Sequence, residues 1–307
     1  DAHIGQFNVE SESELALLAE IAVQKGVDAP VSLRVNPDVD AKTHEKISTG
    51  RAQDKFGINL DKAAELFFHG SEMNGITMEG LAIHIGSQLR EITPFEDAFK
   101  TVGILCKKLR EGGQPIDRID LGGGLGISYD GKDELTLSSY GNLVKRTARE
   151  LGTKIVLEPG RWMVGPAGAV ITRVIRMKSQ GNKNFAIVDM AMNDLLRPAL
   201  YGAWHNIEPI KANSGDPKEL VDFVGPICES GDIIGVNRPV TGLEVNDLVV
   251  VRDAGAYGAV MSSNYNSRLT AAEIIVNGDK TDIIRPRLTY ESMLNRDTIP
   301  RWLTASN

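Results

Sequence analysis

Residues 116–126 read Ile-Asp-Arg-Ile-Asp-Leu-Gly-Gly-Gly-Leu-Gly, a short apolar strand that runs directly into three successive glycines. Glycine has no Cβ, so a backbone of this composition can approach a bound anion closely and direct N–H groups at it. The same segment could be a plain glycine-rich turn, and its spacing is neither that of a Walker loop nor that of a dinucleotide fingerprint. The segment therefore predicts a strand followed by a glycine-rich loop, which either binds a phosphate or is only a tight turn.

Short strands and amphipathic helices alternate on both sides of this segment. Strands are predicted at residues 7–10, 31–36, 81–85, 116–121 and 154–157. Helices with apolar residues at i, i+3, i+4 and i+7 are predicted after a cap at Ser13 and at residues 61–73, 93–111 and 138–151. Five strands that alternate regularly with helices predict a parallel sheet or a barrel.

The pattern changes near residues 164–168, where helical periodicity becomes scarce. Strands separated by turns are predicted at residues 170–177, 184–188, 218–225, 247–252 and 283–286. We therefore expect a second, all-β domain, in the form of a Greek-key barrel.

Two other predicted strands end in chemically unusual loops, HIGSQ and EPGR, and the loops that follow the strands form the active-site mouth of a βα barrel. His84 could stack on a planar cofactor or be a core histidine. Ser87 could bond a phosphate oxygen or cap the next helix. Glu158 could accept a hydrogen bond from a protonated ring nitrogen or pair with Arg161.

Composition excludes several classes of protein. The 307 residues carry a net charge of −7, which argues against a basic nucleic-acid surface. No apolar run is long enough to span a membrane. The two cysteines, Cys106 and Cys228, are too few for a disulfide framework, so we expect a cytoplasmic protein.

Polar clusters in the second half follow predicted strands or lie in segments of mixed polarity, at residues 194–201, 225–232 and 253–258. A lone cysteine in a loop, such as Cys228, is more often inert than reactive, because reactivity requires a lowered thiol pKa. No set of His, Cys and Asp has the spacing of metal ligands, and no metal is expected. The scattered histidines expected to be solvated or structural are His44, His69 and His205.

Taken together, the segments HIGSQ, LGGGLG, EPGR, RPALYG, CESGD and DAGAYG resemble, in order and spacing, the family of meso-diaminopimelate decarboxylases. Residues 47–50 and 55–57 match as well, so the resemblance covers essentially the whole chain. These enzymes are pyridoxal-phosphate decarboxylases built on the alanine-racemase-like barrel. The resemblance implies a (β/α)8 TIM-type barrel, with about its last five strands in residues 1–165, followed by a Greek-key β-barrel domain in residues 166–307.

The resemblance also implies that the cofactor is pyridoxal 5'-phosphate, which acts as an electron sink. The residues it places around the phosphate are Gly122, Gly123, Gly124, Gly160, Arg161, Ser87 and Tyr257. It implies that Glu158 keeps the pyridine nitrogen protonated and that His84 lies flat on one face of the ring.

On the substrate side, the resemblance implies recognition of the second amino-acid group of diaminopimelate. Guanidinium binds carboxylate bidentately, and the residues implied for the distal carboxylate are Arg161 and Arg197, with Tyr201. Tyr257 is also implied to bind the substrate. Glu229 would bind the distal ammonium, whereas ornithine-specific relatives place Asp after the Cys. Cys228 would be the proton donor after carbon dioxide departs. This loop reaches into a neighbouring active site in the family, which implies a homodimer with shared sites.

One family feature is missing from these residues, the Schiff-base lysine of a Tyr-Ala-x-Lys-Ala-Asn-type motif. Lys25, Lys42, Lys46 and Lys55 lie in other contexts. We expect the lysine to fall before Asp1, in roughly the first hundred residues of a longer enzyme that also supply three further barrel strands. The chain alone is then expected to be inactive.

The function implied by the resemblance is conversion of meso-2,6-diaminopimelate to L-lysine and carbon dioxide, the last step of lysine biosynthesis. The first alternative is a related arginine, ornithine or carboxynorspermidine decarboxylase. The second is a lysine-less homologue with a binding or regulatory role.

Overall fold

A computed structural model describes residues 2–40, 49–50, 55–132, 135–211 and 219–304. The chain forms two compact units, residues 1–164 and 165–307, each with a hydrophobic core of its own. Some residues singled out from the sequence lie outside the described ones, namely Lys42, His44, Lys46, Ile47 and Ser48.

The first unit contains a parallel sheet with the strand order β1-β2-β4-β5-β6, in which β3 also pairs with β2. The strands are β1 (Phe7–Val9), β2 (Ala29–Asn36), β3 (Ile58–Asn59), β4 (Ile76–Ala82), β5 (Arg118–Asp120) and β6 (Lys154–Val156). Strands β2, β4, β5 and β6 lie next to one another in the sheet in the same order as in the chain, as expected for successive βα units of a barrel. The predicted parallel alternation is confirmed.

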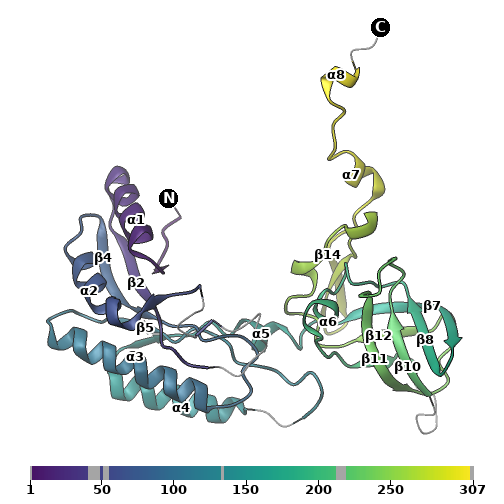
Figure 1. Ribbon diagram of the computed structural model, residues 1–307, viewed down its shortest axis with the longest axis horizontal. Helices are drawn as coiled ribbons and strands as arrows, with labels where there is room; N and C mark the ends of the chain where they lie inside the picture. The colour runs from purple at the N-terminus through teal and green to yellow at the C-terminus, as the bar shows by residue number, and fades with distance from the viewer. Residues whose placement is uncertain (1, 41–48, 51–54, 133–134, 212–218, 305–307) are drawn as a thin grey trace. The chain divides into compact units, whose positions relative to one another are not determined.

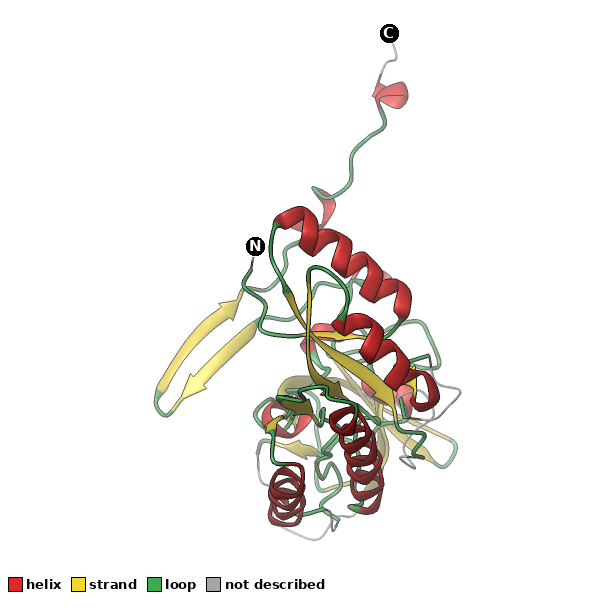
Figure 2. Cartoon of the chain, turned by 90° about the vertical axis from the view of Figure 1, so that its left-hand side faces the viewer, coloured by secondary structure: helices red, strands yellow, loops and turns green. Residues whose placement is uncertain are grey.

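Helices connect the strands of this unit, and Figure 1 shows α3 and α4 side by side. They are α1 (Glu12–Lys25), α2 (Leu60–Ser71), α3 (Thr93–Glu111), α4 (Leu137–Leu151) and the short α5 (Gly160–Val164). In α3, apolar residues spaced three and four apart from Phe95 to Leu109 are buried, which is why the sequence pattern located this helix well. Figure 2 shows these helices in red and the strands in yellow.

Two local predictions for this unit are wrong. The cap of α1 is Ser11, not Ser13, and its side chain accepts a hydrogen bond of 3.1 Å from the N–H of Glu14. The third predicted strand, 81–85, lies too late in the chain, because β4 ends at Ala82. The buried side chains of Ile83 and Ile85 extend the apolar pattern into the loop beyond the sheet.

The second unit is a six-stranded sheet with the order β11-β10-β8-β7-β12-β9. Its edge strands β11 and β9 contact each other, so the sheet forms a nearly closed barrel. Its strands are β7 (Val170–Gln180), β8 (Lys183–Val188), β9 (Ile207–Pro209), β10 (Glu219–Val224), β11 (Ile233–Val240) and β12 (Leu248–Val251). The pairing is antiparallel except between β8 and β10. The prediction of an all-β second half is confirmed.

The remaining elements of this unit are short. They are α6 (Arg197–Tyr201), η2 (Ala259–Met261), η3 (Tyr265–Ser267), the hairpin β13 (Glu273–Asn277) and β14 (Lys280–Arg285), α7 (Tyr290–Leu294) and α8 (Arg301–Thr304). Within the described ranges of both units, no helix is long and apolar enough to cross a membrane.

Candidate active site

The carboxyl ends of β4, β5 and β6 meet at one edge of the sheet, because these strands are successive neighbours and run parallel. Backbone hydrogen bonds continue past the strands: Leu121 donates to Val156 and Glu158 donates to Gly122. The three loops that the sequence singled out, HIGSQ, LGGGLG and EPGR, are therefore brought together.

The three glycines lie packed against the neighbouring loops. A Cβ on Gly122, Gly123 or Gly124 would clash with a backbone carbonyl oxygen, that of Ile83, Glu158 or Gly86 respectively. Gly122 and Gly124 also have positive φ angles of 68° and 95°. Glycine is thus required at these positions by close backbone approach and by backbone conformation.

Two N–H groups of this loop are used within the protein. Gly122 donates to Oδ1 of Asp120 over 2.9 Å, and Gly123 donates to Nδ1 of His84 over 3.2 Å. Gly122 and Gly123 therefore shape the loop and hold Asp120 and His84 in place. Asp120 has no assigned role in the sequence prediction, although an Asp two residues before a glycine is a turn signal that could have identified it.

His84 is held in one protonation state. Its Nδ1 accepts the Gly123 N–H, so a neutral ring carries its proton on Nε2. Burial lowers the pKa of His84 below 6.5, the nearby Arg34 lowers it further, and Asp120 partly opposes the shift. The ring is therefore a neutral imidazole near pH 7.

Glu158 is paired with a second carboxyl group. It remains accessible to solvent, yet desolvation raises its pKa, and the charge of Asp120 with a hydrogen bond to it raises the pKa further. Asp120 itself is buried and accepts hydrogen bonds from Asn8 and Gln6, each over 3.3 Å. Glu158 is consequently a stronger base than an ordinary glutamate.

Arg161 and Ser87, both predicted to bind the cofactor, contact each other directly. The buried guanidinium donates to the Ser87 hydroxyl over 3.0 Å and to the Tyr129 hydroxyl over 2.7 Å. Ser87 is not the cap of α3, because Ile92 occupies that position. Tyr129 lies beyond the quoted motifs, and no spacing rule in the sequence pointed to it.

In the second unit, Arg197 and Tyr201 begin and end the short helix α6. Arg197 is buried, and its Nη1 lies 2.6 Å from Nε2 of His205. Tyr257 follows β12 in a left-handed backbone conformation with φ of 57° and is exposed.

Cys228 and Glu229 are both exposed in the loop between β10 and β11. The hydroxyl of Tyr265 donates to Glu229 over 2.6 Å, a partner that the sequence motifs did not include. The buried carboxylate of Asp232 accepts the N–H groups of Ile227 and Met192. Asp232 thus joins the loop of Cys228 to the segment that leads into α6.

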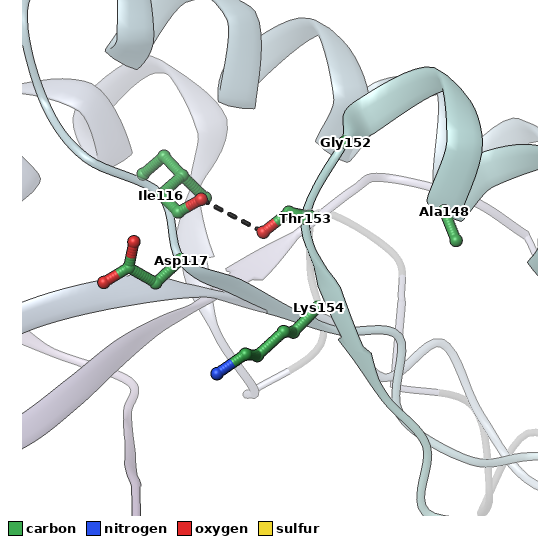
Figure 3. Close-up of a pocket in the computed structure, with 6 residues that line it drawn as sticks. All are labelled: Ile116, Asp117, Ala148, Gly152, Thr153 and Lys154. Carbon is green, nitrogen blue, oxygen red and sulfur yellow. Dashed lines mark hydrogen bonds between the residues drawn. The ribbon is translucent and has the colours of Figure 1, made fainter.

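A cavity of about 450 Å³ lies elsewhere on the first unit, and Figure 3 shows its six lining residues. They are Ile116, Asp117, Ala148, Gly152, Thr153 and Lys154. These residues precede or begin β5 and β6, so the cavity lies at the amino ends of the strands. In βα barrels, residues at this face contribute to the stability of the fold, whereas catalytic residues lie at the opposite face. The cavity is separate from the three loops described above.

The described part of the chain holds no group of three or more His, Cys, Asp or Glu side chains that could bind a metal ion. The groups that the three loops and their neighbours bring together are a carboxyl pair, a neutral imidazole, a guanidinium and hydroxyl groups. These groups suit a planar anionic cofactor with a basic ring nitrogen, because the carboxyl of Glu158 can accept from a ring N–H and the joined Arg161 and Ser87 can donate to an anion.

Comparisons with known proteins agree on one family. Residues 1–165 match the model of the pyridoxal-dependent decarboxylase, pyridoxal binding domain. The chain is 41% identical over 302 residues to the diaminopimelate decarboxylase of Zymomonas mobilis, covering 98% of this chain and 71% of that protein. It is 45% identical over 290 residues to that of Vibrio cholerae, covering 94% and 69% respectively.

The fold matches a solved structure equally well. The crystal structure of diaminopimelate decarboxylase from M. jannaschii in co-complex with L-lysine aligns with a TM-score of 0.92 and 35% sequence identity. The alignment covers 98% of this chain and 71% of the solved one.

Proposed function

Because this chain belongs to the diaminopimelate decarboxylases within the pyridoxal-dependent decarboxylase family, we propose that it converts meso-2,6-diaminopimelate to L-lysine and carbon dioxide. The observation that carries this proposal is the identity of 41% to 45% to diaminopimelate decarboxylases over nearly the whole chain. The reaction is a carboxy-lyase step that ends lysine biosynthesis.

Pyridoxal phosphate is the cofactor, and when bound it supplies the electron sink for the carbon that loses its carboxylate. The Glu158 carboxylate would accept a hydrogen bond from the protonated ring nitrogen of the cofactor. Desolvation first, and then the charge of Asp120, raise the pKa of Glu158, so its carboxylate would be a better hydrogen-bond acceptor for the protonated ring nitrogen than an ordinary glutamate. His84, neutral and held by Gly123, would present a flat face to the ring without adding a competing charge.

The phosphate requires positive charge and hydroxyl donors. Ser87 and Arg161 are already joined by a hydrogen bond, and both would bind phosphate oxygens, together with Tyr257. Gly122 and Gly123 would shape the phosphate site through their bonds to Asp120 and His84, and Gly124 would contribute its backbone N–H. Gly160 adds to this because its Cβ position is open space.

The distal end of the substrate carries a carboxylate and an ammonium group. Arg197 and Arg161, with Tyr201, would bind the carboxylate, and Glu229 would bind the ammonium. Tyr257 would also contact the substrate. Cys228 would donate a proton to the carbon that has lost carbon dioxide. The exposure of its side chain is compatible with delivery of a proton to a bound substrate.

We also infer that the lysine that binds the cofactor covalently is not among the lysines of this chain. Among the described residues, no lysine occurs within four residues after β1, β2, β4, β5 or β6, and Lys62, three residues after β3, is exposed in the first turn of α2. The chain alone should then be inactive. Borohydride reduction with cofactor should leave no covalent cofactor on it, and a covalent adduct mapped to one of its lysines would contradict the inference.

We further propose that the enzyme is a cytoplasmic homodimer whose active sites are shared, on the basis of the family resemblance and of the two free cysteines. Shared sites have a distinctive test. A mixture of Glu158→Gln and Cys228→Ala proteins should regain about a quarter of parent activity, because half of the dimers then hold one intact site. A mixture that stays inactive after subunit exchange would contradict shared sites.

The reaction itself is tested by product balance. The complete protein, loaded with pyridoxal phosphate, should release L-lysine and carbon dioxide from meso-diaminopimelate in equal amounts. Release of carbon dioxide without L-lysine, or no release, would contradict the proposed function.

A further inference from the structure

Arg197 is a buried cation that lies beside a buried histidine. The guanidinium lies at the first position of α6 and is only 5% exposed, so its N–H groups require acceptors inside the protein. One of them faces His205, eight residues later, across 2.6 Å. His205 is completely buried at 0% exposure.

The two contacts of His205 fix its tautomer. A guanidinium has only donors, so Nε2 must accept from Arg197. Nδ1 lies 2.8 Å from the carbonyl oxygen of Arg252, and a carbonyl only accepts, so Nδ1 must carry the proton. The imidazole is neutral and acts as a bridge between the two groups.

The bridge connects two segments that the proposed function uses. Arg252 follows β12 directly and leads into the segment that holds Tyr257. Its N–H donates to the carbonyl of Asn206 over 2.9 Å, so the backbone beside His205 continues the pairing of β9 with β12. His205 is therefore anchored to the barrel wall, and its Nε2 accepts a hydrogen bond from the guanidinium.

We propose that His205 is a positioning residue that holds Arg197 in the orientation required to bind the distal carboxylate. This inference rests on the proposed function, because that function supplies the carboxylate. A guanidinium binds a carboxylate through two parallel hydrogen bonds, so rotation of its plane costs affinity even when the charge remains.

Two substitutions separate the contacts. His205→Gln places an amide oxygen near the position of Nε2 and keeps an acceptor for Arg197. His205→Asn places its amide near Nδ1, keeps a donor for the Arg252 carbonyl and removes the acceptor. His69→Asn, on the exposed surface of α2, is the matched control.

The variants are made in the complete, cofactor-loaded enzyme and compared by three readouts. The first is KM and kcat for meso-diaminopimelate. The second is inhibition by L-lysine, which keeps the distal carboxylate, and by cadaverine, which has no carboxylate. Cofactor absorbance and the thermal midpoint report on folding.

His205→Asn should raise KM and the L-lysine inhibition constant about tenfold, as expected for one lost hydrogen bond to a charged group. Its kcat and its inhibition by cadaverine should stay within about twofold of the parent. His205→Gln should fall between the parent and His205→Asn, and His69→Asn should match the parent. Equal losses for L-lysine and cadaverine, or unchanged L-lysine inhibition in a folded His205→Asn protein, would overturn the proposal.

A double-mutant cycle decides the case if His205→Asn does not fold. His205→Gln should weaken L-lysine binding about threefold in the parent and not at all in an Arg197→Ala background. An equal loss in both backgrounds would overturn the proposal. Failure of the parent enzyme to use meso-diaminopimelate would instead overturn the proposed function, so the two failures are distinguishable.

Discussion

The backbone N–H of Gly123 donates a hydrogen bond of 3.2 Å to Nδ1 of His84. This bond joins the glycine loop after β5 to the loop after β4, two segments that are 39 residues apart in the chain. It also fixes the tautomer of the imidazole that we propose to lie on the cofactor ring. The central feature of the site is thus a hydrogen bond from the backbone of the glycine loop to the His84 side chain.

Substitution of Gly123 by Ala should reduce cofactor affinity. The added Cβ would clash with the carbonyl oxygen of Glu158, so the glycine loop and Glu158 must separate, at a cost of about 1–3 kcal/mol. Titration with pyridoxal phosphate measures the loss. Gly141→Ala is the control, because Gly141 has open space around it in α4 and Ala there should stabilise the fold by about 0.5–1 kcal/mol. Equal cofactor affinity of the two variants would contradict the packing argument.

The pKa of His84 predicts a pH dependence of stability. Its folded pKa lies below the unfolded value of 6.5, so the unfolded chain binds more protons at mildly acidic pH. The contribution of His84 is therefore fully present above about pH 6.5 and is lost as pH falls through that value toward the folded pKa. His84→Asn keeps an acceptor near Nδ1 but does not titrate.

Urea unfolding of the cofactor-free protein at pH 5.5 and pH 7.5 measures this effect. The parent should lose more unfolding free energy between the two pH values than His84→Asn does. The account of His84 as a neutral buried group fails if the variant shows the same or a larger loss.

Glu158→Gln removes the base that we propose for the ring nitrogen of the cofactor. A hydrogen bond to a charged group contributes about 1.5–3 kcal/mol, so kcat should fall by about tenfold to a hundredfold. Steady-state rates with saturating cofactor test this, and Glu150→Gln, in the last turns of α4, is a control on the same unit. A variant with full kcat would show that Glu158 has no part in the chemistry.

Cys228→Ala tests the proposed proton donor. General acid groups contribute about 10²–10⁴-fold, so turnover should fall within that range while the cofactor remains bound. Cys106→Ala is the matched control, because that thiol is buried in α3. Turnover equal to that of the control, with normal cofactor absorbance, would remove Cys228 from this role.

The regular elements of the barrel unit could be predicted because their residues repeat with a clear period. Helix α3 shows this best, since each buried position from Phe95 to Leu109 follows the helical spacing. Strand β11 was not predicted, because Gly235 and Pro239 interrupt its apolar pattern and register shifts disturb its pairing with β10. The pairing of β11 with β10 tolerates these residues, but a pattern read from the sequence of one strand does not show its pairing.

The residues of the site could be predicted as motifs, but their partners could not. The segment that contains Arg197 stands out as a cluster of unusual polar residues, whereas His205 was expected to be merely solvated or structural. Its bond to Arg197 depends on how α6 lies beside the start of β9. The bond between Glu229 and Tyr265 likewise joins residues 36 positions apart. Contacts of this kind follow from the tertiary fold and leave no periodic signal in the sequence.

The most direct test of the account is the substrate preference of the complete, cofactor-loaded enzyme. Rates of carbon dioxide release from meso-diaminopimelate, L-lysine, L-ornithine and L-arginine are compared as kcat/KM. Substrates without a distal carboxylate lack the group that we propose to bind the buried Arg197 guanidinium through two hydrogen bonds, so meso-diaminopimelate should be preferred by about a hundredfold or more. An equal or higher kcat/KM for L-ornithine, L-arginine or L-lysine would contradict the account.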